Sequence, residues 1–457
     1  RCVRTQDIES VGKTDRHATY FEMLGDFSFG DYFKNEAIHW AFEFLTKVIG
    51  LEKDRLWITV YKDDEEAFRI WTEEMGIAPD HMFKLGKEDN FWELDQGPCG
   101  PCSEIHYDRG EKYGEGTSPL DNSDRFMEIW NLVFTQFDKK SDGTYEPLAN
   151  PNIDTGMGLE RIAVVVEDVA NIFEVSTFRP LRDKIETLSG KKYGQSAKID
   201  ESIRIIMDHS KAMTFLVLDG IVPSNEGRGY ILRRLLRRAY RHGKLLGIEG
   251  EFLTSIIDYV IEVYKNEYPE LLEAKERIYK VIVREENQFQ QTIDQGLELL
   301  NKVITDLKEN NRNEISGEEA FKLYDTYGFP LDLTMEIASE QGISIDEEAF
   351  NACMKKQREK SRENRKGGVG WDETVKLDLS DVDATIFTGY DHFTDEVKVA
   401  SIFVNNEKVN EIKEGEEGII ILNKTPFYGE GGGQIGDTGT IETESVKFVV
   451  NETTKDA

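Results

Sequence analysis

The chain has 457 residues, of which 39% are hydrophobic and 32% are charged, so its length predicts roughly two to four domains that can each bury a core. No apolar run reaches the roughly 20 residues that cross a bilayer, no secretory signal pattern is present, and four cysteines are too few for a disulfide framework. These features predict a cytoplasmic protein, and the net charge of −32 excludes nucleic-acid binding over the whole surface, so any such contact must be local.

The first part of the chain mixes strand-like with helix-like runs. Residues 56–61 and 128–137 are rich in the aliphatic and aromatic residues typical of strands. Residues 36–49 have helical periodicity and are followed by Gly50, a residue type common just after a helix. We therefore predict an α+β domain over residues 1–180.

Beyond this domain the pattern becomes helical, from about residue 198 to residue 366. Apolar residues recur near the helical period within residues 269–310, namely Leu271, Leu272, Ile278, Val281, Ile282, Phe289, Ile293 and Leu297. Residues 355–368 are charged and close with two glycines, which predicts a linker, and short β-type runs follow it. We predict an all-α domain over residues 181–366 and a β domain over residues 367–457.

Two stretches of the first domain suit a nucleotide. The opening Arg1-Cys-Val-Arg4 and residues 16–33 combine cations with aromatic rings, and arginine binds phosphate while an aromatic face can stack on a base. Residues 152–167 form a glycine-containing turn that opens a helix with Arg161 in its early turns, and a helix start can hold an anion. A core hairpin with surface arginines and a plain glycine turn are the alternatives.

Three further positions are candidates for binding a small substrate. Asn131 interrupts an otherwise apolar strand, where its amide needs a hydrogen-bonding partner. Asp154 lies beside glycines before a helix, so it could cap that helix or face a ligand. Trp92, taken alone, is more typical of core packing.

Cys99, Cys102 and His106 raise the question of a zinc site, since such spacing can supply two or three ligands. We reject this interpretation, because a structural zinc site needs four ligands and the remaining cysteines lie far off in the sequence. Residues 103–108 also alternate like a strand of a sheet.

The strongest local charge feature is at residues 227–244, which hold seven Arg or Lys residues and no acidic residue. At helical spacing, a buried stripe would leave the arginines along the outside. The stripe consists of Ile231, Leu232, Leu235, Leu236 and Ala239. This pattern predicts a local RNA contact, and the alternative is a basic helix that pairs with neighbouring acidic helices.

Several motifs in order resemble the alanyl-tRNA synthetase family of class II aminoacyl-tRNA synthetases. The strand-loop-strand around Arg4 and Phe21 is similar to motif 2 of that class, and Gly156-Met-Gly-Leu-Glu-Arg161 is similar to motif 3. Other matching stretches are Phe91-Trp92, Gly97-Pro-Cys-Gly-Pro-Cys102, Glu128-Ile-Trp-Asn131, Pro223-Ser-Asn-Glu-Gly-Arg-Gly-Tyr230 and Tyr324-Asp-Thr-Tyr-Gly-Phe-Pro330. The resemblance covers essentially the whole chain. It implies a class II antiparallel sheet flanked by helices, an all-α tRNA-recognition domain and a truncated β-barrel.

The same resemblance implies a ligase that activates alanine with ATP and transfers the alanyl group to the 3′ end of tRNA(Ala). It assigns catalysis to Arg4 and Arg161, and ATP binding to Arg4, His17, Phe21, Glu22 and Arg161. It assigns alanine binding to Trp92, Asn131, Asp154 and Gly156. ATP brings Mg²⁺, for which Glu104 and Asp108 are candidate contributors.

For the RNA partner, Asn225 and Asp325 match positions that read the wobble G·U pair of the acceptor stem in that family, where base edges lie in the shallow minor groove. Arg228, Arg233 and Arg237 are expected to contact the same RNA.

Residues 425–439 resemble the entry to the family's proofreading domain. Its zinc cluster needs a paired-histidine motif, which the seven histidines do not form. We therefore expect neither zinc nor deacylase activity in this chain.

The resemblance also indicates a piece of a longer protein, since the motif 1 region is not found, most of the editing domain is missing, and the loop 5–12 is short. A non-catalytic tRNA-binding module over residues 198–366 is the rival interpretation, and a stand-alone editing hydrolase is a third. Adenylate formation separates the ligase from the module, and the sequence does not predict the oligomeric state.

Overall fold

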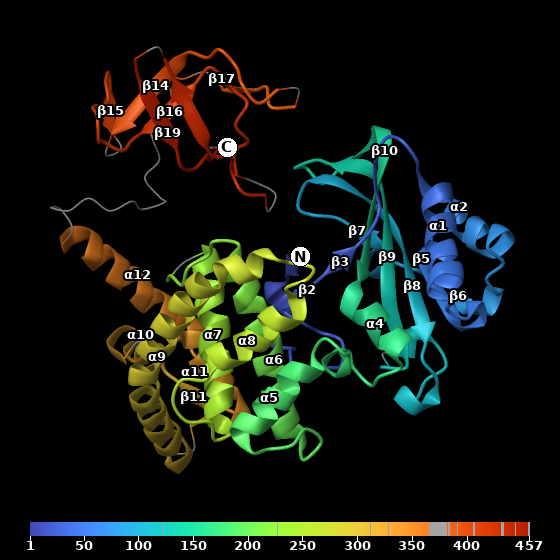
Figure 1. Ribbon diagram of the computed structural model, residues 1–457, viewed down its shortest axis with the longest axis horizontal. Coiled ribbons are helices and arrows are strands. Elements are labelled where there is room, and N and C mark those ends of the chain that lie inside the picture. Colours follow the sequence, from blue (N-terminus) through green and yellow to red (C-terminus); the bar gives the residue numbers. More distant parts are fainter. Residues whose placement is uncertain are drawn as a thin grey trace. The chain divides into compact units, whose positions relative to one another are not determined.

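The computed structural model describes residues 1–121, 123–225, 227–310, 312–327, 329–364, 382, 384–390, 392–404, 407–430, 434–443 and 445–455 (Figure 1). The chain divides into two compact units, Arg1–Cys353 and Met354–Ala457. Among the described residues, no helix is both long enough and apolar enough to cross a membrane.

A mixed, mostly antiparallel sheet forms the first part of the first unit. Its strands follow the order β3-β10-β9-β8-β5-β6, with β4 added to β10 and β7 added to β8. The bounds are β3 (Met23–Leu24), β4 (Phe27–Phe29), β5 (Leu56–Tyr61), β6 (Met82–Leu85), β7 (Phe91–Trp92), β8 (Gly97–Asp108), β9 (Phe126–Lys139) and β10 (Tyr145–Gly158). The predicted α+β character is confirmed, and the two predicted strands lie in β5 and β9.

The sheet buries one face, called the back face here, and leaves the other, called the open face, more accessible. On β10, Thr155 and Met157 are almost fully buried, whereas Asp154 is exposed and Gly156 is half-buried. Successive side chains of a strand point to opposite faces. Asp154 and Gly156 therefore belong to the open face.

Helix α1 (Lys34–Glu43) covers the back face, and α4 (Leu159–Glu167) lies on the other side of the sheet (Figure 1). The helical path of α1 continues through a π-type turn over Phe44–Ile49 and ends at Gly50, whose φ of 85° is left-handed. Phe44 packs edge-on against Trp130 of β9, with 5.9 Å between the ring centroids. The predicted helix at 36–49 is thus confirmed.

A buried ion pair joins α1 to the start of α2 (Glu65–Arg69). The Lys34 ammonium lies 2.9 Å from the Asp64 carboxylate, and the two side chains are only 6% and 4% exposed. The same ammonium lies 5.6 Å and 5.5 Å from the ring centroids of Phe33 and Phe134. Asp64 also accepts a hydrogen bond from the Ala67 backbone N–H, which caps α2.

We expect Lys34→Met to lower the free energy of unfolding by about 3 kcal/mol, because it leaves the Asp64 carboxylate buried without its counter-charge. Urea unfolding followed by circular dichroism measures this. Lys47→Met is the control, since Lys47 pairs with Glu43 on the surface, where a pair contributes about 0.5 kcal/mol. Equal losses in the two variants would contradict the prediction.

Helices dominate the rest of the first unit. They are α5 (Arg179–Ser189), α6 (Ala197–Leu218), α7 (Gly227–Leu245), α8 (Leu253–Tyr264), α9 (Glu270–Glu309), α10 (Gly317–Tyr327) and α11 (Leu331–Glu340), and α12 (Glu347–Asn364) follows. The predicted stripe of α9 largely faces the core, since Leu271, Ile278 and Phe289 are fully buried, but Leu272 is 53% exposed.

A buried polar network ties α6 and α7 to the segment between β1 (Cys2–Val3) and β2 (Tyr20–Phe21). Arg238 donates hydrogen bonds of 3.0 Å to the Ile8 carbonyl oxygen and to His209 Nε2. Because His209 Nε2 accepts, its Nδ1 carries the proton and donates to Asp208 at 2.8 Å. Asp208 in turn accepts the Thr19 backbone N–H at 2.8 Å.

On α11, Glu336 is the carboxylate at the centre of a second cluster. It lies 3.3 Å from Arg238, from Arg241 and from His242, and all four side chains are nearly buried. The hydroxyl of Ser202 lies 3.0 Å from the other ring nitrogen of His242. One carboxylate therefore pairs with two buried guanidinium groups.

The second unit consists of three small sheets in its described residues. They pair β13 (Ile386–Phe387) with β17 (Lys424–Thr425), β14 (Val399–Val404) with β15 (Glu407–Val409) and β16 (Ile419–Leu422), and β18 (Gly439–Glu442) with β19 (Lys447–Val450). No closed barrel joins these strands where the structure describes them. The segment predicted as a linker is helical up to Asn364, and its residues 365–368 lie outside the described residues.

Candidate active site

The β1–β2 hairpin brings the first predicted pair of nucleotide residues together. β1 pairs antiparallel with β2, and the Arg4 backbone N–H donates to the Thr19 carbonyl oxygen at 2.8 Å. The Arg4 guanidinium lies 5.1 Å from the centroid of the Phe21 ring, and the Arg4 side chain is 48% exposed. A cation and an aromatic ring are thus presented side by side to solvent.

Arg161 lies in the first turn of α4, directly after β10. Its guanidinium forms a 2.7 Å ion pair with Glu128 of β9. Burial opposes ionisation of Glu128, but its interactions with Arg161, His106 and Arg4 hold the pKa of this carboxyl below its usual range. Glu128 is therefore ionised and fixes the direction of Arg161, a role that the sequence analysis did not assign to it.

His17 and Glu22 lie on the same hairpin as Arg4. Burial, together with the cations Arg16, Arg161 and Arg4, lowers the pKa of His17, so its ring is neutral at pH 7. The His17 Nδ1 atom lies 2.8 Å from the Thr14 hydroxyl. The Glu22 carboxylate accepts a hydrogen bond from the Tyr268 hydroxyl, which connects this strand to the helical region.

Polar residues form a row across the open face of the sheet. Asn131 of β9 is directly opposite Glu104 of β8 and Gly156 of β10, and Asp154 is two residues from Gly156 on the same face. A register shift between β8 and β9 follows, after which His106 is opposite Glu128. Such a bulge places an extra residue in one strand, so Asn131 and Glu128 both face the same side although they are three residues apart.

Two acceptors in this row have no protein partner among the described residues. The Asn131 Oδ1 atom is buried and accepts no hydrogen bond. The Asp154 carboxylate makes no ion pair, and partial desolvation by the surrounding protein raises its pKa. Neighbouring acceptors of this kind suit a ligand with several N–H donors, such as a primary ammonium group.

Trp92 lies on β7, opposite Gly100 of β8, and is 41% exposed. Strands β8 and β9 separate it from Asp154 on β10. Trp92 therefore lies at the β8 end of the polar row, and Asp154 lies at the β10 end. Gly100 itself has no room for a side chain, since a Cβ atom there would lie 2.0 Å from the Phe134 carbonyl oxygen.

Asp108 is not brought together with the other predicted residues. Arg125 binds both of its carboxylate oxygens at 2.7 Å, and the Gly110 backbone N–H donates to one of them. Glu104 is more accessible for a cation and lies 3.3 Å from His106. Within the described residues, no group of three or more His, Cys, Asp or Glu side chains is arranged to hold a metal ion.

The cysteine pair lies inside β8, where both residues are buried as free cysteines. Burial raises the pKa of Cys102 to about 12, so this thiol stays protonated at pH 7. A protonated thiol is a poor zinc ligand, because zinc binds the thiolate.

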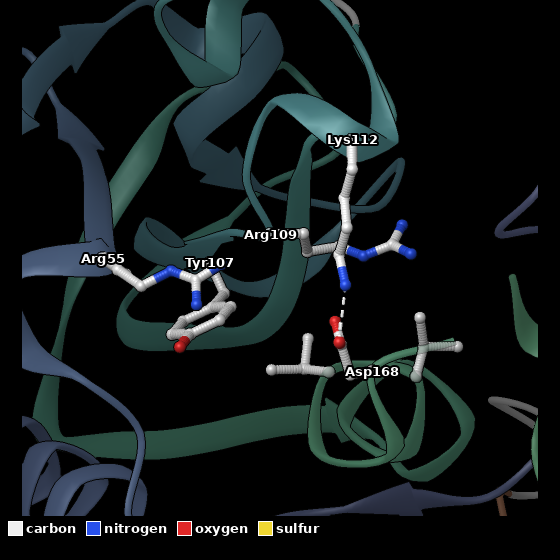
Figure 2. A pocket seen from close by; sticks show the side chains of 7 residues that line it. Arg55, Tyr107, Arg109, Lys112 and Asp168 are labelled. Atoms are coloured by element: carbon white, nitrogen blue, oxygen red, sulfur yellow. Dashed lines mark hydrogen bonds and ion pairs between the residues drawn. The ribbon is translucent and has the colours of Figure 1, made fainter. Parts of the chain in front are cut away.

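A cavity at the other end of α4 has a different role (Figure 2). The Arg109 guanidinium donates to the carbonyl oxygens of Val169 and Ala170, just past α4. Lys112 pairs with Asp168 at 2.5 Å, and Asp168 ends the helix with a left-handed φ of 52°. Since cations stabilise the carboxyl end of a helix, these charges hold α4 in place.

The predicted RNA-binding helix has fewer outward arginines than expected. Leu232, Leu235, Leu236 and Ala239 are buried as predicted, but Arg238 and Arg241 are also buried, at 3% and 4% exposure. Their expected place along the outside is therefore wrong. The reason is that the Glu336 carboxylate meets them in the interior, where a paired guanidinium can be accommodated.

Two of the predicted RNA contacts are also held by a carboxylate. Arg233 and Arg237 both pair with Glu285 of α9, at 3.0 Å and 2.9 Å. Arg233 additionally donates to the Asn225 side-chain oxygen. The alternative of a basic helix paired with acidic neighbours thus applies to this part of α7.

Arg228 is exposed in the first turn of α7, and Asp325 is exposed on α10. Both side chains therefore lie at the surface of the helical region.

Comparison with known proteins shows the family of the chain. The family described as tRNA synthetases class II (A) matches residues 1–457. The chain is 53% identical to an alanine–tRNA ligase of Caldicellulosiruptor saccharolyticus over 97% of its own length and 51% of that protein. It is 52% identical to an alanine–tRNA ligase of Clostridioides difficile, over 100% of its own length and 53% of that protein. The chain thus spans about half the length of the curated relatives it matches, and it belongs to the class II (A) tRNA synthetases.

Proposed function

We propose that the chain carries the amino-acid activation site of an alanine–tRNA ligase. The observation that carries this proposal is that Arg4, which lies against the Phe21 ring, and Arg161 both act on Glu128 of β9, the strand that also carries the unpartnered acceptor Asn131. The names of the relatives supply the amino acid.

The reaction needs two steps and no covalent enzyme intermediate. The alanine carboxylate oxygen attacks the α-phosphorus of ATP, the bond to the bridging oxygen breaks, and pyrophosphate leaves. The terminal ribose hydroxyl of tRNA(Ala) then attacks the carbonyl carbon of the adenylate, loses its proton, and AMP leaves. Catalysis rests on positioning and on cationic stabilisation of the phosphate oxygens.

For ATP, Arg4 contacts the α-phosphate, and the adenine lies between the Phe21 ring and the Arg161 guanidinium. Glu128 holds Arg161 flat against the base. His17 and Glu22 line the same pocket, the latter with its backbone, because Tyr268 engages its carboxylate.

Magnesium enters with ATP, and its role is to neutralise phosphate charge. Mg²⁺ at such sites is held by substrate phosphates and one or two carboxylates. Glu104 on the open face fits that requirement, whereas Asp108 does not, because Arg125 occupies both of its oxygens.

For alanine, Asp154 pairs with the ammonium and Asn131 accepts a hydrogen bond. Gly156 lies between them on the open face, where a Cβ atom would lie 2.7 Å from the Met23 Sδ atom, and Trp92 limits the size of the side chain at the far border. One methylene contributes only about 1–3 kcal/mol of discrimination. The pocket is therefore expected to discriminate only weakly between alanine and its close relatives glycine and serine.

For the RNA, we propose that residues 181–366 bind the acceptor stem of tRNA(Ala). Asn225 and Asp325 read the G·U pair, Arg228 contacts phosphate, and Arg233 with Arg237 orients the Asn225 end of α7. The division into domains at 1–180, 181–366 and 367–457, the class II order of the sheet and a barrel in the last part belong to the same proposal.

Alanine-dependent ATP–pyrophosphate exchange by this chain tests the proposal without RNA. We expect exchange with alanine, less with serine, and none without an amino acid. A folded sample that exchanges nothing but binds tRNA(Ala) would favour the rival, a non-catalytic tRNA-binding module.

A further inference from the structure

Lys211 of α6 and Glu160 of α4 form a buried ion pair next to the proposed ATP site. Their charged atoms are 2.6 Å apart, and the side chains are 1% and 6% exposed. Three aromatic rings surround the ammonium, with centroids 4.9 Å away at Tyr20, 5.2 Å at Phe178 and 4.7 Å at Tyr264. Such rings stabilise a desolvated cation. They therefore help Lys211 to remain charged although it is buried.

The second oxygen of Glu160 holds the junction between β2 and α4. It accepts the Glu22 backbone N–H at 3.1 Å. The Glu22 carbonyl oxygen in turn accepts the Leu159 backbone N–H at 2.9 Å. Phe21 directly precedes Glu22, and Arg161 directly follows Glu160, so these two hydrogen bonds join the residues next to both walls of the proposed adenine pocket.

We propose that Lys211 is a positioning residue for ATP, which neutralises Glu160 and thereby fixes the spacing between Phe21 and Arg161. The proposal rests on the assignment of those two residues to ATP. Lys211 itself is not assigned to contact either the nucleotide or alanine. It belongs to the helical region, which we propose to bind RNA.

The energetic reason is the cost of a buried, uncompensated carboxylate. Burial favours the neutral amine, yet the Glu160 carboxylate outweighs it and keeps the pKa of Lys211 above its usual value. Without the ammonium, Glu160 must take up a proton or move toward water. Either change weakens its bond to Glu22, and a shift of about 1 Å at a binding site can cost on the order of 100-fold.

Asp154, the residue proposed to bind the alanine ammonium, is held in place by other strands than Phe21 is. Asp154 pairs with Phe27 of β4 and with Val133 of β9 in the sheet ladder. Neither Phe27 nor Val133 takes part in the Lys211–Glu160 ion pair. Loss of Lys211 should therefore affect ATP and leave alanine binding nearly unchanged.

Lys211→Met tests the proposal by calorimetric titration with ATP alone and with alanine alone. We expect the dissociation constant for ATP to rise about tenfold or more and that for alanine to stay within about twofold. Lys34→Met is the matched control, since Lys34 is also buried, paired with a carboxylate and flanked by two aromatic rings. It should lose stability but keep both affinities within about twofold.

Wild-type ATP affinity in folded Lys211→Met would overturn the proposal, and so would an equal loss of ATP affinity in Lys34→Met. Should Lys211→Met fail to fold, Glu160→Gln decides in the same way, with weakened ATP and intact alanine binding as support and unchanged ATP binding as refutation. A wild-type chain that binds ATP but shows no alanine-dependent exchange refutes the ligase and leaves the Lys211 result standing. A wild-type chain that binds no ATP overturns both.

Discussion

Asp154→Asn should lower the rate of alanine-dependent ATP–pyrophosphate exchange about 30-fold or more, because losing one partner of a desolvated charge pair typically costs about 2–5 kcal/mol. The loss should appear mainly as weaker alanine binding, with ATP binding unchanged. Asp138→Asn is the control, since Asp138 is a carboxylate of the same sheet that pairs with Lys140. Equal exchange rates in the two variants would contradict the role of Asp154.

The pH dependence supplies a second signature of Asp154. Its pKa is raised by desolvation, and only the ionised carboxylate binds an ammonium. Alanine affinity is therefore complete above this pKa and is lost as the pH falls through it, at a higher pH than for an ordinary aspartate. Since the folded state disfavours the ionised form, Asp154→Asn should not lower the melting temperature at pH 7. A marked drop would indicate a structural role instead.

Glu336→Leu should lower the free energy of unfolding by about 3–5 kcal/mol, the typical cost of leaving buried charges without their partner. Arg238 and Arg241 would remain in the interior without the Glu336 carboxylate. Urea unfolding measures the loss. Asp258→Asn is the control, because Asp258 pairs with Lys275 at the surface and should cost less than about 1 kcal/mol. A midpoint of urea unfolding equal to that of the wild type would refute the prediction for Glu336→Leu.

Acid should destabilise the same cluster. Burial, with the cations Arg238 and Arg241, lowers the pKa of His242 to about 4, and the cations and His242 hold the pKa of Glu336 well below its usual range despite burial. Both folded-state values are depressed, so the stabilisation is complete above the unfolded pKa values and is lost as the pH falls. For His242 the loss runs from about pH 6.5 to about pH 4.

Local patterns were enough to predict the scaffold of the site. The run at 56–61 is β5 with the same bounds, and Arg161 lies at a helix start as its glycine-rich approach indicates. Both inferences depend only on neighbours in the sequence, where alternation and capping rules apply directly.

The partners of the charged residues could not be predicted in this way. Helical spacing identified the apolar stripe of α7 but not the buried Arg238, because its counter-charge Glu336 lies 98 residues further along the chain. In the sequence, Glu128 stands out only as part of a motif, and strict alternation would place its side chain on the other face of the sheet from Asn131. The irregular register between β8 and β9 brings both to one face, and no local rule reveals it.

The contacts of α6 limit how parts of this protein can be exchanged with those of a homologue. Asp208 and Lys211, three residues apart, bind the backbone of Thr19 and the side chain of Glu160. The limit near residue 180 is therefore a change of architecture but not a line along which the unit can be cut. A chimera that takes the sheet from one homologue and the helices from another must keep both partners of each of these contacts, or the pocket that we propose for ATP will lose its support.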